Sequence, residues 1–151
     1  MIEIKRVKWE ESESDLLAVR KAVFVEEQGV PEEIEVDEYD AVSRHFLARN
    51  PDGDAVGTAR LLPNGKVGRV AVLKTYRGLG IGTALMRQVI QTWKTHRAES
   101  SLDPPSTLHL HAQSSSIGFY ESFGFVAKGP EFEEAGIPHR SMAFQEKIEK
   151  K

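Results

Sequence analysis

A glycine-rich stretch from Val70 to Met86 constrains the fold of this chain more than any other part of the sequence. Strand-forming residues open the stretch and a helical pattern closes it, with apolar residues at a spacing of four: Leu85, Val89 and Trp93. Three glycines occupy the junction where the chain must turn: Gly78, Gly80 and Gly82. The first amides of such a helix have no intrahelical partner and lie at the positive end of its dipole. We therefore expect a strand, a turn and a helix that bind a phosphate or pyrophosphate, with Lys74 and Arg77 at the rim.

The glycine spacing separates this loop from two other phosphate-binding motifs. A P-loop ends in Gly-Lys-Ser or Gly-Lys-Thr, whereas this stretch has Gly82-Thr83-Ala84. The dinucleotide fingerprint is G-x-G-x-x-G, and the order from Arg77 to Gly82 is R-G-L-G-I-G. A purely structural role, in which the glycines allow a helix to pack closely on a strand, is the competing interpretation. The glycine stretch alone does not distinguish a phosphate-binding role from a structural one, so the evidence has to come from other residues.

Length and charge limit the class of protein. The 151 residues, 40% of them hydrophobic, suit a single domain that spans residues 1–151. A formal net charge of −3 argues against a nucleic-acid partner, and no apolar run reaches membrane-spanning length. The lack of cysteine excludes a disulfide framework and a cysteine nucleophile, and it suits a cytoplasmic location. The sequence does not decide between a monomer and a homodimer.

Periodicity predicts the element order β-α-α-β-β-β-α-β-α-β-β. The first strand contains Ile2 and Ile4, and Ser12 or Ser14 caps a helix that begins near Asp15. That helix ends before Gly29 and Pro31, and the central helix ends near residues 95–96, followed by a polar loop over 97–106. Further strands are expected at 44–49, 55–62, 67–73 and 107–113, from residue 125, and at 140–148, with a short helix after Ser116.

An acidic segment follows the first helix. Residues 22–43 hold eight of the 23 acidic residues and no lysine or arginine: the acids are Glu26, Glu27, Glu32, Glu33, Glu35, Asp37, Glu38 and Asp40. For most of these carboxylates we expect a solvated loop. The alternative is an anionic rim that attracts a cationic amine.

Two motifs in sequence order resemble one protein family. The loop from Arg77 to Gly82 resembles the acetyl-CoA pyrophosphate loop, R/Q-x-x-G-x-G/A, of the GNAT superfamily of N-acetyltransferases. The stretch from Ala112 to Phe125, with Phe119-Tyr120 before Gly124, resembles the second signature of that superfamily. Residues 19–40 and 132–139 are similar to its ElaA/YjcF-type branch. The resemblance covers nearly the whole chain and implies an α+β fold, a three-layer sandwich whose mixed sheet has two splayed parallel central strands.

The resemblance also implies acetyl-CoA as the cofactor, without a metal. Acetyl-CoA would bind between the strands that end at Leu73 and Gln113, with the Val70 N–H polarising the thioester carbonyl. Backbone amides from Arg77 to Thr83 would hold the pyrophosphate. The expected cofactor-binding residues are Val70, Ala71, Val72, Arg77, Gly78, Leu79, Gly80, Ile81, Gly82, Thr83, Gln113, Phe119 and Tyr120.

The implied reaction includes two proton transfers, one from the attacking amine and one to the departing thiolate, and each needs a residue that can perform it. The resemblance places Tyr120 as the general acid for the departing thiolate, and a tyrosine with a pKa of about 10 stays protonated at neutral pH. A core aromatic is the structural alternative for Tyr120. Candidate bases are Glu27 and His111, beside Glu26, Asp37 or a water chain from a surface carboxylate. His109 and His111 share one face of a strand without a third ligand at zinc spacing.

The implied reaction is direct attack of a primary amine on the thioester in a ternary complex. We expect the acceptor to be a small molecule. It would be either an amino sugar or its phosphate, contacted by arginines, or a polyamine-like amine attracted by the acidic segment. A protein or peptide amine and a non-catalytic acyl-CoA-binding sensor or scaffold are the alternatives. We expect the acceptor pocket at the helix end 26–28, the turn 35–40 and the loop 136–139. The acceptor-binding candidates are Arg20, Phe24, Glu27, Gln28, Asp37 and His139.

Overall fold

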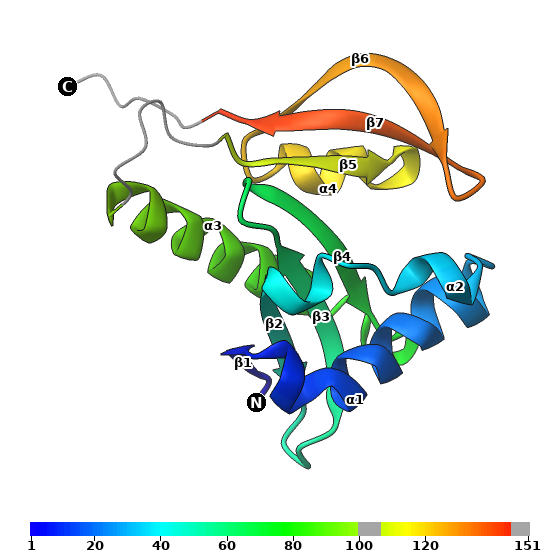
Figure 1. The fold of residues 1–151 in the computed structure, drawn as a ribbon, viewed down its shortest axis with the longest axis vertical. Helices are drawn as coiled ribbons and strands as arrows, with labels where there is room; N and C mark the ends of the chain where they lie inside the picture. The colour runs from blue at the N-terminus through cyan, green and yellow to red at the C-terminus, as the bar shows by residue number, and fades with distance from the viewer. Residues whose placement is uncertain (100–106, 146–151) are drawn as a thin grey trace.

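A seven-stranded mixed sheet runs through the molecule (Figure 1), and the computed structural model describes residues 1–99 and 107–145. The strands lie in the order β1-β2-β3-β4-β5-β7-β6. Their bounds are β1 Glu3–Val7, β2 Arg44–Arg49, β3 Ala55–Leu61, β4 Lys66–Val72, β5 His109–Gln113, β6 Phe125–Glu134 and β7 Ile137–Phe144. Every neighbouring pair is antiparallel except β4 and β5, which run parallel.

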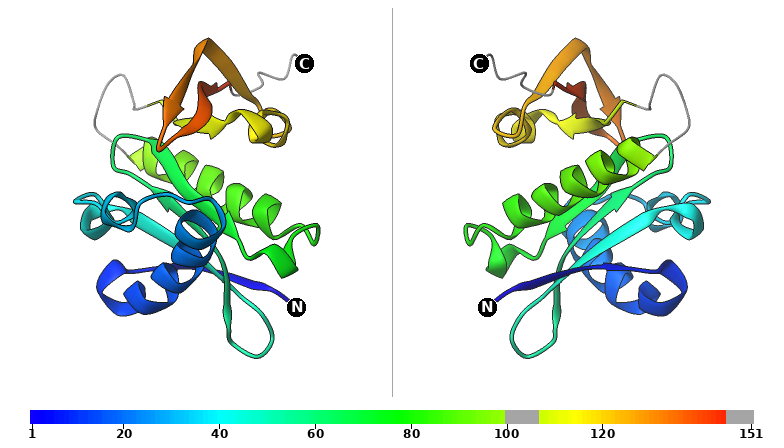
Figure 2. Two further views of the ribbon diagram at one scale, coloured as in Figure 1. Left: turned by 90° about the vertical axis from the view of Figure 1, so that its right-hand side faces the viewer. Right: turned by 90° about the vertical axis from the view of Figure 1, so that its left-hand side faces the viewer.

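Two long helical segments cover opposite faces of β2, β3 and β4 (Figure 2). Helix α1 (Trp9–Arg20) continues into a π-helical segment (Lys21–Glu27), and helix α3 (Ile81–Glu99) packs on the other face. The core beneath α3 includes Leu85 and Val89, while Val19 and Val23 form a smaller cluster beneath α1 with Ala71. The described residues also form short helices α2 (Glu32–Glu35) and α4 (Ile117–Glu121) and three 3-10 turns (Asp40–Val42, Lys74–Tyr76, Ser114–Ser116).

The two parallel strands separate soon after they begin. β4 and β5 share only two register pairs, Lys66 with His109 and Val67 with Leu110. On its other side, β4 pairs with β3 through a bulge that sets Arg69 and Val70 opposite the single residue Ala59. Arg69 adopts a left-handed backbone with φ of 50°, and the hydroxyl of Thr58 donates to its carbonyl at 2.9 Å. The expected mixed sheet with two splayed central strands is therefore confirmed.

Three predicted boundaries are wrong. Helix α1 begins at Trp9, with Lys8 as its N-cap and no side-chain cap, so neither Ser12 nor Ser14 caps it. Acidic Glu10 and Glu11 in its first turn complement the helix dipole and allow the earlier start. Helix α3 continues to Glu99, past the predicted end, and most of the predicted polar loop lies outside the described residues.

The last strand also starts earlier than expected. β7 begins at Ile137 because a tight hairpin joins it to β6, with Ala135 and Gly136 both at positive φ. Positions 137–139, predicted as loop, are therefore strand. The predicted end of this strand, at residues 146–148, lies outside the described residues.

Candidate active site

A cavity of about 650 Å³ opens where β4 and β5 separate. The two strands form facing walls, and the π-helical segment, the residues around α2 and the β6–β7 hairpin enclose the remaining sides. Many predicted site residues line it: Phe24, Gln28, Asp37, Val70, Ala71, Val72, Arg77, His111, Gln113, Tyr120 and His139. Arg20, Glu27, Phe119 and residues 78–83 are not part of this lining.

The glycine loop presents a run of backbone amides beside the cavity. Gly78 and Gly80 have φ of 81° and 83°, a left-handed conformation that glycine adopts without strain. Within the described ranges no backbone carbonyl accepts from the amides of residues 78–83, and the first amide bonded back into the loop is that of Ala84, to Gly80. A side chain at Gly82 would meet the ring of Phe119 at 3.3 Å, so this glycine lets α3 approach α4.

Arg77 makes its own contacts at the start of the glycine loop. Its backbone N–H donates to the carbonyl of Lys74 at 3.3 Å, so the free amides begin one residue later, at Gly78. Its guanidinium forms a two-pronged ion pair with Glu27, at 2.5 and 2.6 Å, and donates to the carbonyl of Val72. The hydrogen bonds from Arg77 lower the pKa of Glu27. A carboxylate with a lowered pKa and an occupied pair of oxygens is a poor proton acceptor.

The bulge in β4 sets the backbone at the cavity wall. Val70 has no register partner on β3 or β5, whereas Ala71 pairs with Thr58 and Val72 pairs with Gly57. Ala71 packs beneath the π-helical segment, so it serves the core as well as the wall. Val70 and Arg69 are therefore the two residues of this strand without a register partner on either neighbour.

Tyr120 lies on α4 and borders the cavity. Its ring packs edge-on against Phe119 and Phe125, with centroids 5.0 and 6.1 Å away. The hydroxyl has no hydrogen-bond partner among the described residues. Burial raises the pKa of Tyr120 to about 12, which keeps the phenol protonated across the physiological range.

Opposite β4, His111 and Glu134 form a hydrogen-bonded pair that the sequence did not reveal. His111 Nδ1 lies 3.0 Å from a Glu134 oxygen, and the ring of His111 packs edge-on against Phe132. Burial raises the pKa of Glu134, but the hydrogen bond from His111 and nearby charges lower it by more. An ionised carboxylate accepts only, so Nδ1 carries the proton and Nε2 of a neutral His111 keeps its lone pair. This tautomer is the one that a general base requires.

His139 belongs to the same corner. It is 6% exposed, donates from Nδ1 to the carbonyl of Ile137 at 2.6 Å and stacks on Phe132. Its Nε2 lies 3.8 Å from the second oxygen of Glu134. Glu134 thus lies near both histidines, and the β5–β7 pairing together with the register of the β6–β7 hairpin brings the three together.

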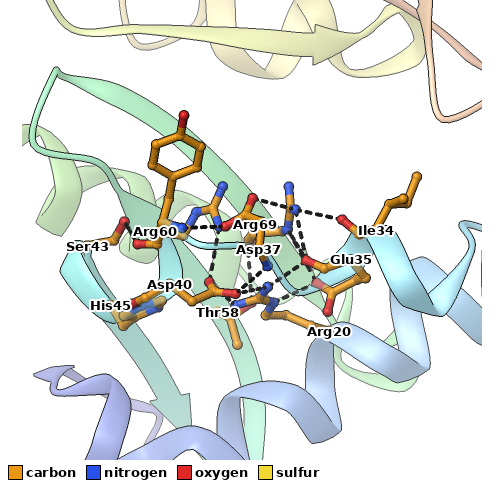
Figure 3. A network of polar contacts seen from close by, with 11 residues as sticks. Arg20, Ile34, Glu35, Asp37, Asp40, Ser43, His45, Thr58, Arg60 and Arg69 are labelled. Carbon is orange, nitrogen blue, oxygen red and sulfur yellow. Dashed lines mark hydrogen bonds and ion pairs between the residues drawn. The ribbon is translucent and has the colours of Figure 1, made fainter.

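The acidic segment is not simply solvated. Glu35 and Asp40 are 3% and 1% exposed, and both bind Arg20, which is itself 1% exposed (Figure 3). Arg60 and Arg69 join the same network (Figure 3), so the expectation of a solvated loop fails for two of the eight acids. Arg20 is enclosed beneath the cavity and contacts Trp9, which gives it a supporting position and not a contacting one.

The end of the π-helical segment is tied to the second wall. Gln113 on β5 donates to the side chain of Gln28 at 2.8 Å across 85 residues of sequence. This bond joins a predicted cofactor residue to a predicted acceptor residue. Phe24, one turn earlier, lines the same side of the cavity.

Two classes of site find no support in the described parts of the chain. In residues 1–99 and 107–145, no three or more histidine, aspartate or glutamate side chains are grouped to hold a metal ion. None of the helices in those ranges is long and apolar enough to cross a lipid bilayer.

Comparison with known proteins gives consistent relatives. A family model described as an acetyltransferase (GNAT) domain matches residues 10–146. ElaA from Escherichia coli K12 is 36% identical over 135 residues, 85% of this chain and 84% of ElaA. The N-acetyltransferase YjcF from Bacillus subtilis 168 is 36% identical over 138 residues, 88% of this chain and 92% of YjcF.

Two crystal structures share the architecture. That of Escherichia coli ElaA aligns with a TM-score of 0.81 at 32% identity, covering 96% of this chain and 100% of the other. An acyl-CoA N-acyltransferase from Pseudomonas aeruginosa gives a TM-score of 0.81 at 30% identity, with the same coverage of 96% and 100%.

Proposed function

This chain belongs to the GNAT acetyltransferase family and is an acyltransferase, and we propose that it transfers acetyl from acetyl-CoA to the primary amine of a small molecule. The family membership and the ElaA and YjcF relatives agree with the resemblance that the two motifs indicate. The reaction class follows from the family. The acceptor and the residue roles below are our proposals.

The residues beside the cavity fit an acyl-CoA thioester. The amides of residues 78–83 are free to donate to the pyrophosphate, and no atom of the described residues beyond the immediate chain neighbours lies within 4 Å of the side-chain position at Gly78 or Gly80. Acetyl-CoA, when bound, supplies the acetyl thioester and a thiolate leaving group. Phe119 and Tyr120 close one side of this region, while Val70 to Val72 and Gln113 border the cavity.

Val70 would stabilise the oxyanion. Its unpaired position in the bulge leaves its N–H without a register partner on either neighbouring strand. A backbone donor fixed in a sheet needs no reorganisation when negative charge develops on the carbonyl oxygen. The bulge at Arg69 and Val70 is therefore the structural basis of the oxyanion donor.

Two side chains would divide the proton transfers. His111 takes the proton of the attacking amine on Nε2, because Glu134 holds the Nδ1 proton and orients the ring. Tyr120 holds a proton for the leaving thiolate, because burial keeps its phenol un-ionised. We prefer His111 to Glu27 as the base, since Glu27 lies outside the cavity lining and pairs with Arg77.

The cavity itself carries the proposal: a β4 backbone bulge, His111 and Tyr120 border one space between two separating strands. The test measures thiol release from acetyl-CoA over a panel of small amines. His111→Ala should lower kcat by about 10²–10⁴, the usual contribution of a general base, and added imidazole should restore part of it. Glu27→Gln is the comparison. A larger loss of kcat there, with no imidazole rescue of His111→Ala, would move the base to Glu27.

A binding module without catalysis makes a different prediction. A sensor or scaffold would bind CoA without releasing thiol in the presence of any amine. It would also be insensitive to changes at Tyr120, which borders the cavity but makes no hydrogen bond within the described residues. Thiol release that depends on added amine therefore separates the enzyme from the sensor.

A further inference from the structure

Two guanidinium groups form one part of the cavity wall. Arg60 comes from β3 and Arg69 from the bulge of β4, and both line the cavity. The carboxylate of Asp37 bridges them, 2.7 Å from Arg60 Nη1 and 3.2 Å from Arg69 Nη2. In Figure 3 the two groups lie beside each other and point away from α1, towards the side on which β5 lies.

Each guanidinium keeps hydrogen-bond donors that the described residues do not use. Arg60 is 4% exposed, and its Nε is enclosed without a partner. Arg60 Nη2 and Arg69 Nη1 also have no acceptor within the described ranges, but they are not enclosed. A buried donor without an acceptor is costly, and native proteins satisfy nearly all of them. An oxyanion in the cavity would accept from Arg60 Nη2 and Arg69 Nη1, whereas the enclosed Nε of Arg60 is out of its reach.

Three arginines and three carboxylates make up the network around this pair, so its formal charges balance. Glu35 and Asp40 lie 3.3 and 3.0 Å from Arg69 and Arg60, but their shorter bonds, 2.6 and 2.8 Å, go to Arg20. Burial, and then the charges of Arg60 and Arg20, lower the pKa of Arg69. Asp37 is thus the carboxylate that faces both guanidinium groups at the cavity, and Lys66 adds a further cation to the lining.

We propose that Arg60 and Arg69 form an anion subsite, and that the acetyl acceptor is a small primary amine that carries a carboxylate or a phosphate. The assignment rests on the proposed acetyltransferase function and names its substrate class. The anion would lie between the two guanidinium groups and the amine would face His111 across the same cavity. Such an arrangement disfavours polyamines, because they carry no anion and would leave the unused guanidinium donors without an acceptor.

The cavity also limits the size of the acceptor. Arg60, Arg69 and His111 border one cavity of about 650 Å³, which the acetyl end of acetyl-CoA would share. The remaining space suits a small molecule better than a long chain.

Matched pairs of amines isolate the effect of the anion. Lysine is compared with cadaverine, phosphoethanolamine with ethanolamine, and a phosphorylated amino sugar with the free amino sugar, by thiol release from acetyl-CoA. We expect the anionic member of at least one pair to have a kcat/KM about 10- to 100-fold higher, as hydrogen bonds to a charged group contribute. The lysine pair reports on a carboxylate and the other two on a phosphate. Transfer to amines without an anionic preference in any pair would overturn the subsite while leaving the acetyltransferase function intact.

Variants assign the preference to the two arginines. Arg69→Met should reduce the ratio of the two kcat/KM values to near one, and a ratio measured within one protein is insensitive to the fraction that folds. Arg69→Lys serves if the methionine variant does not fold, because lysine keeps the charge but loses the forked contact, so the ratio should still fall. Arg140→Met is the matched control, since Arg140 binds the carbonyl of Gly129 and does not line the cavity. An unchanged ratio in both Arg69 variants would refute the assignment.

A binding measurement keeps the subsite testable without turnover. Inorganic phosphate is titrated by calorimetry into the wild type, Arg69→Met and Arg140→Met. CoA is present throughout, so that its pyrophosphate occupies the glycine loop and inorganic phosphate does not bind there. We expect phosphate to bind the wild type and Arg140→Met but not Arg69→Met. Equal binding, or no binding, in all three proteins would refute the anion subsite even if no amine in the panel is acetylated.

Discussion

Tyr120→Phe separates the chemical role of a hydroxyl from its structural role. The phenol lies at the cavity, has no hydrogen-bond partner among the described residues and keeps its ring contacts with Phe119 and Phe125 after the change. Its removal therefore breaks no described hydrogen bond, and the free energy of unfolding should change by close to zero. If the hydroxyl protonates the leaving thiolate, kcat should fall by about 10²–10⁴, which corresponds to roughly 3–5 kcal/mol of barrier.

Tyr76→Phe is the matched control with the opposite expectation. Its hydroxyl accepts a hydrogen bond from Asn50 Nδ2 at 3.0 Å and does not border the cavity. Losing that bond should cost about 0.5–1.5 kcal/mol, or a few degrees in Tm for a chain of this size, without changing kcat. Tyr120→Phe should thus lower kcat without changing the free energy of unfolding, and Tyr76→Phe should lower the free energy of unfolding without changing kcat.

The assay is single-turnover thiol release at saturating acetyl-CoA and amine, with thermal melting of each variant and calorimetry of CoA. Burial raises the pKa of Tyr120 to about 12, so at pH 9 roughly one molecule in a thousand has lost this proton. The wild-type rate should therefore show no alkaline loss from Tyr120 up to about pH 10. Full turnover of Tyr120→Phe, when chemistry limits the rate, would remove Tyr120 from the mechanism and leave protonation of the thiolate to water.

Two further changes test the glycine loop and the buried network. Gly80→Asp should weaken CoA binding because it places a negative charge beside the free amides. Gly53→Asp, at a similar φ of 88° in a distant turn, should leave CoA binding unchanged. Equal CoA affinity of the wild type and both variants by calorimetry would contradict the pyrophosphate site. Arg20→Met should lower the free energy of unfolding, measured in urea, by about 3–5 kcal/mol, because it leaves Glu35 and Asp40 buried with fewer partners. Arg49→Met breaks a half-exposed pair with Asp15 and should lower the free energy of unfolding by about 0–1 kcal/mol. Burial raises the pKa of Asp40, but hydrogen bonds from Arg20 and other groups lower it by more. The stabilisation of the folded state by this network is therefore present above the ordinary pKa of 3.8 and is lost as the pH falls below that value. The stability of Arg20→Met should therefore depend less on acid pH than that of the wild type, and equal acid sensitivity would contradict this role of Arg20.

The glycine loop and the order of the elements could be predicted because their signals are local. Left-handed glycines, the strand before them and the apolar spacing after them all lie within a few residues, and the second motif repeats that agreement downstream. The start of α1 was misplaced because serine is a strong cap, whereas two glutamates in a first turn are a weaker signal.

The buried network could not be read in the same way, because its partners meet only in three dimensions. Within the acidic segment, Ile34 and Val42 are 50% and 62% exposed while Glu35 and Asp40 are buried, the reverse of what hydropathy predicts. Arginines from α1, β3 and β4 cause this reversal, and they lie 15–34 residues from their carboxylates. Glu134 was missed for the same reason, since its contact with His111 depends on the register of a distant hairpin.

The brief pairing of β4 with β5 divides the sheet into two parts with little backbone pairing between them. The unit of β1–β4 and the unit of β5–β7 share two backbone register pairs, while the apolar core under α3 includes side chains from both units. Trp93 near the end of α3 meets Phe144 of β7 with ring centroids 5.7 Å apart, on the far side of this division from the glycine loop. Because packed interiors transmit strain, we expect a change of volume at this contact to widen or narrow the gap between β4 and β5. Substitutions far from the reacting atoms can therefore retune the size of molecule that the enzyme admits.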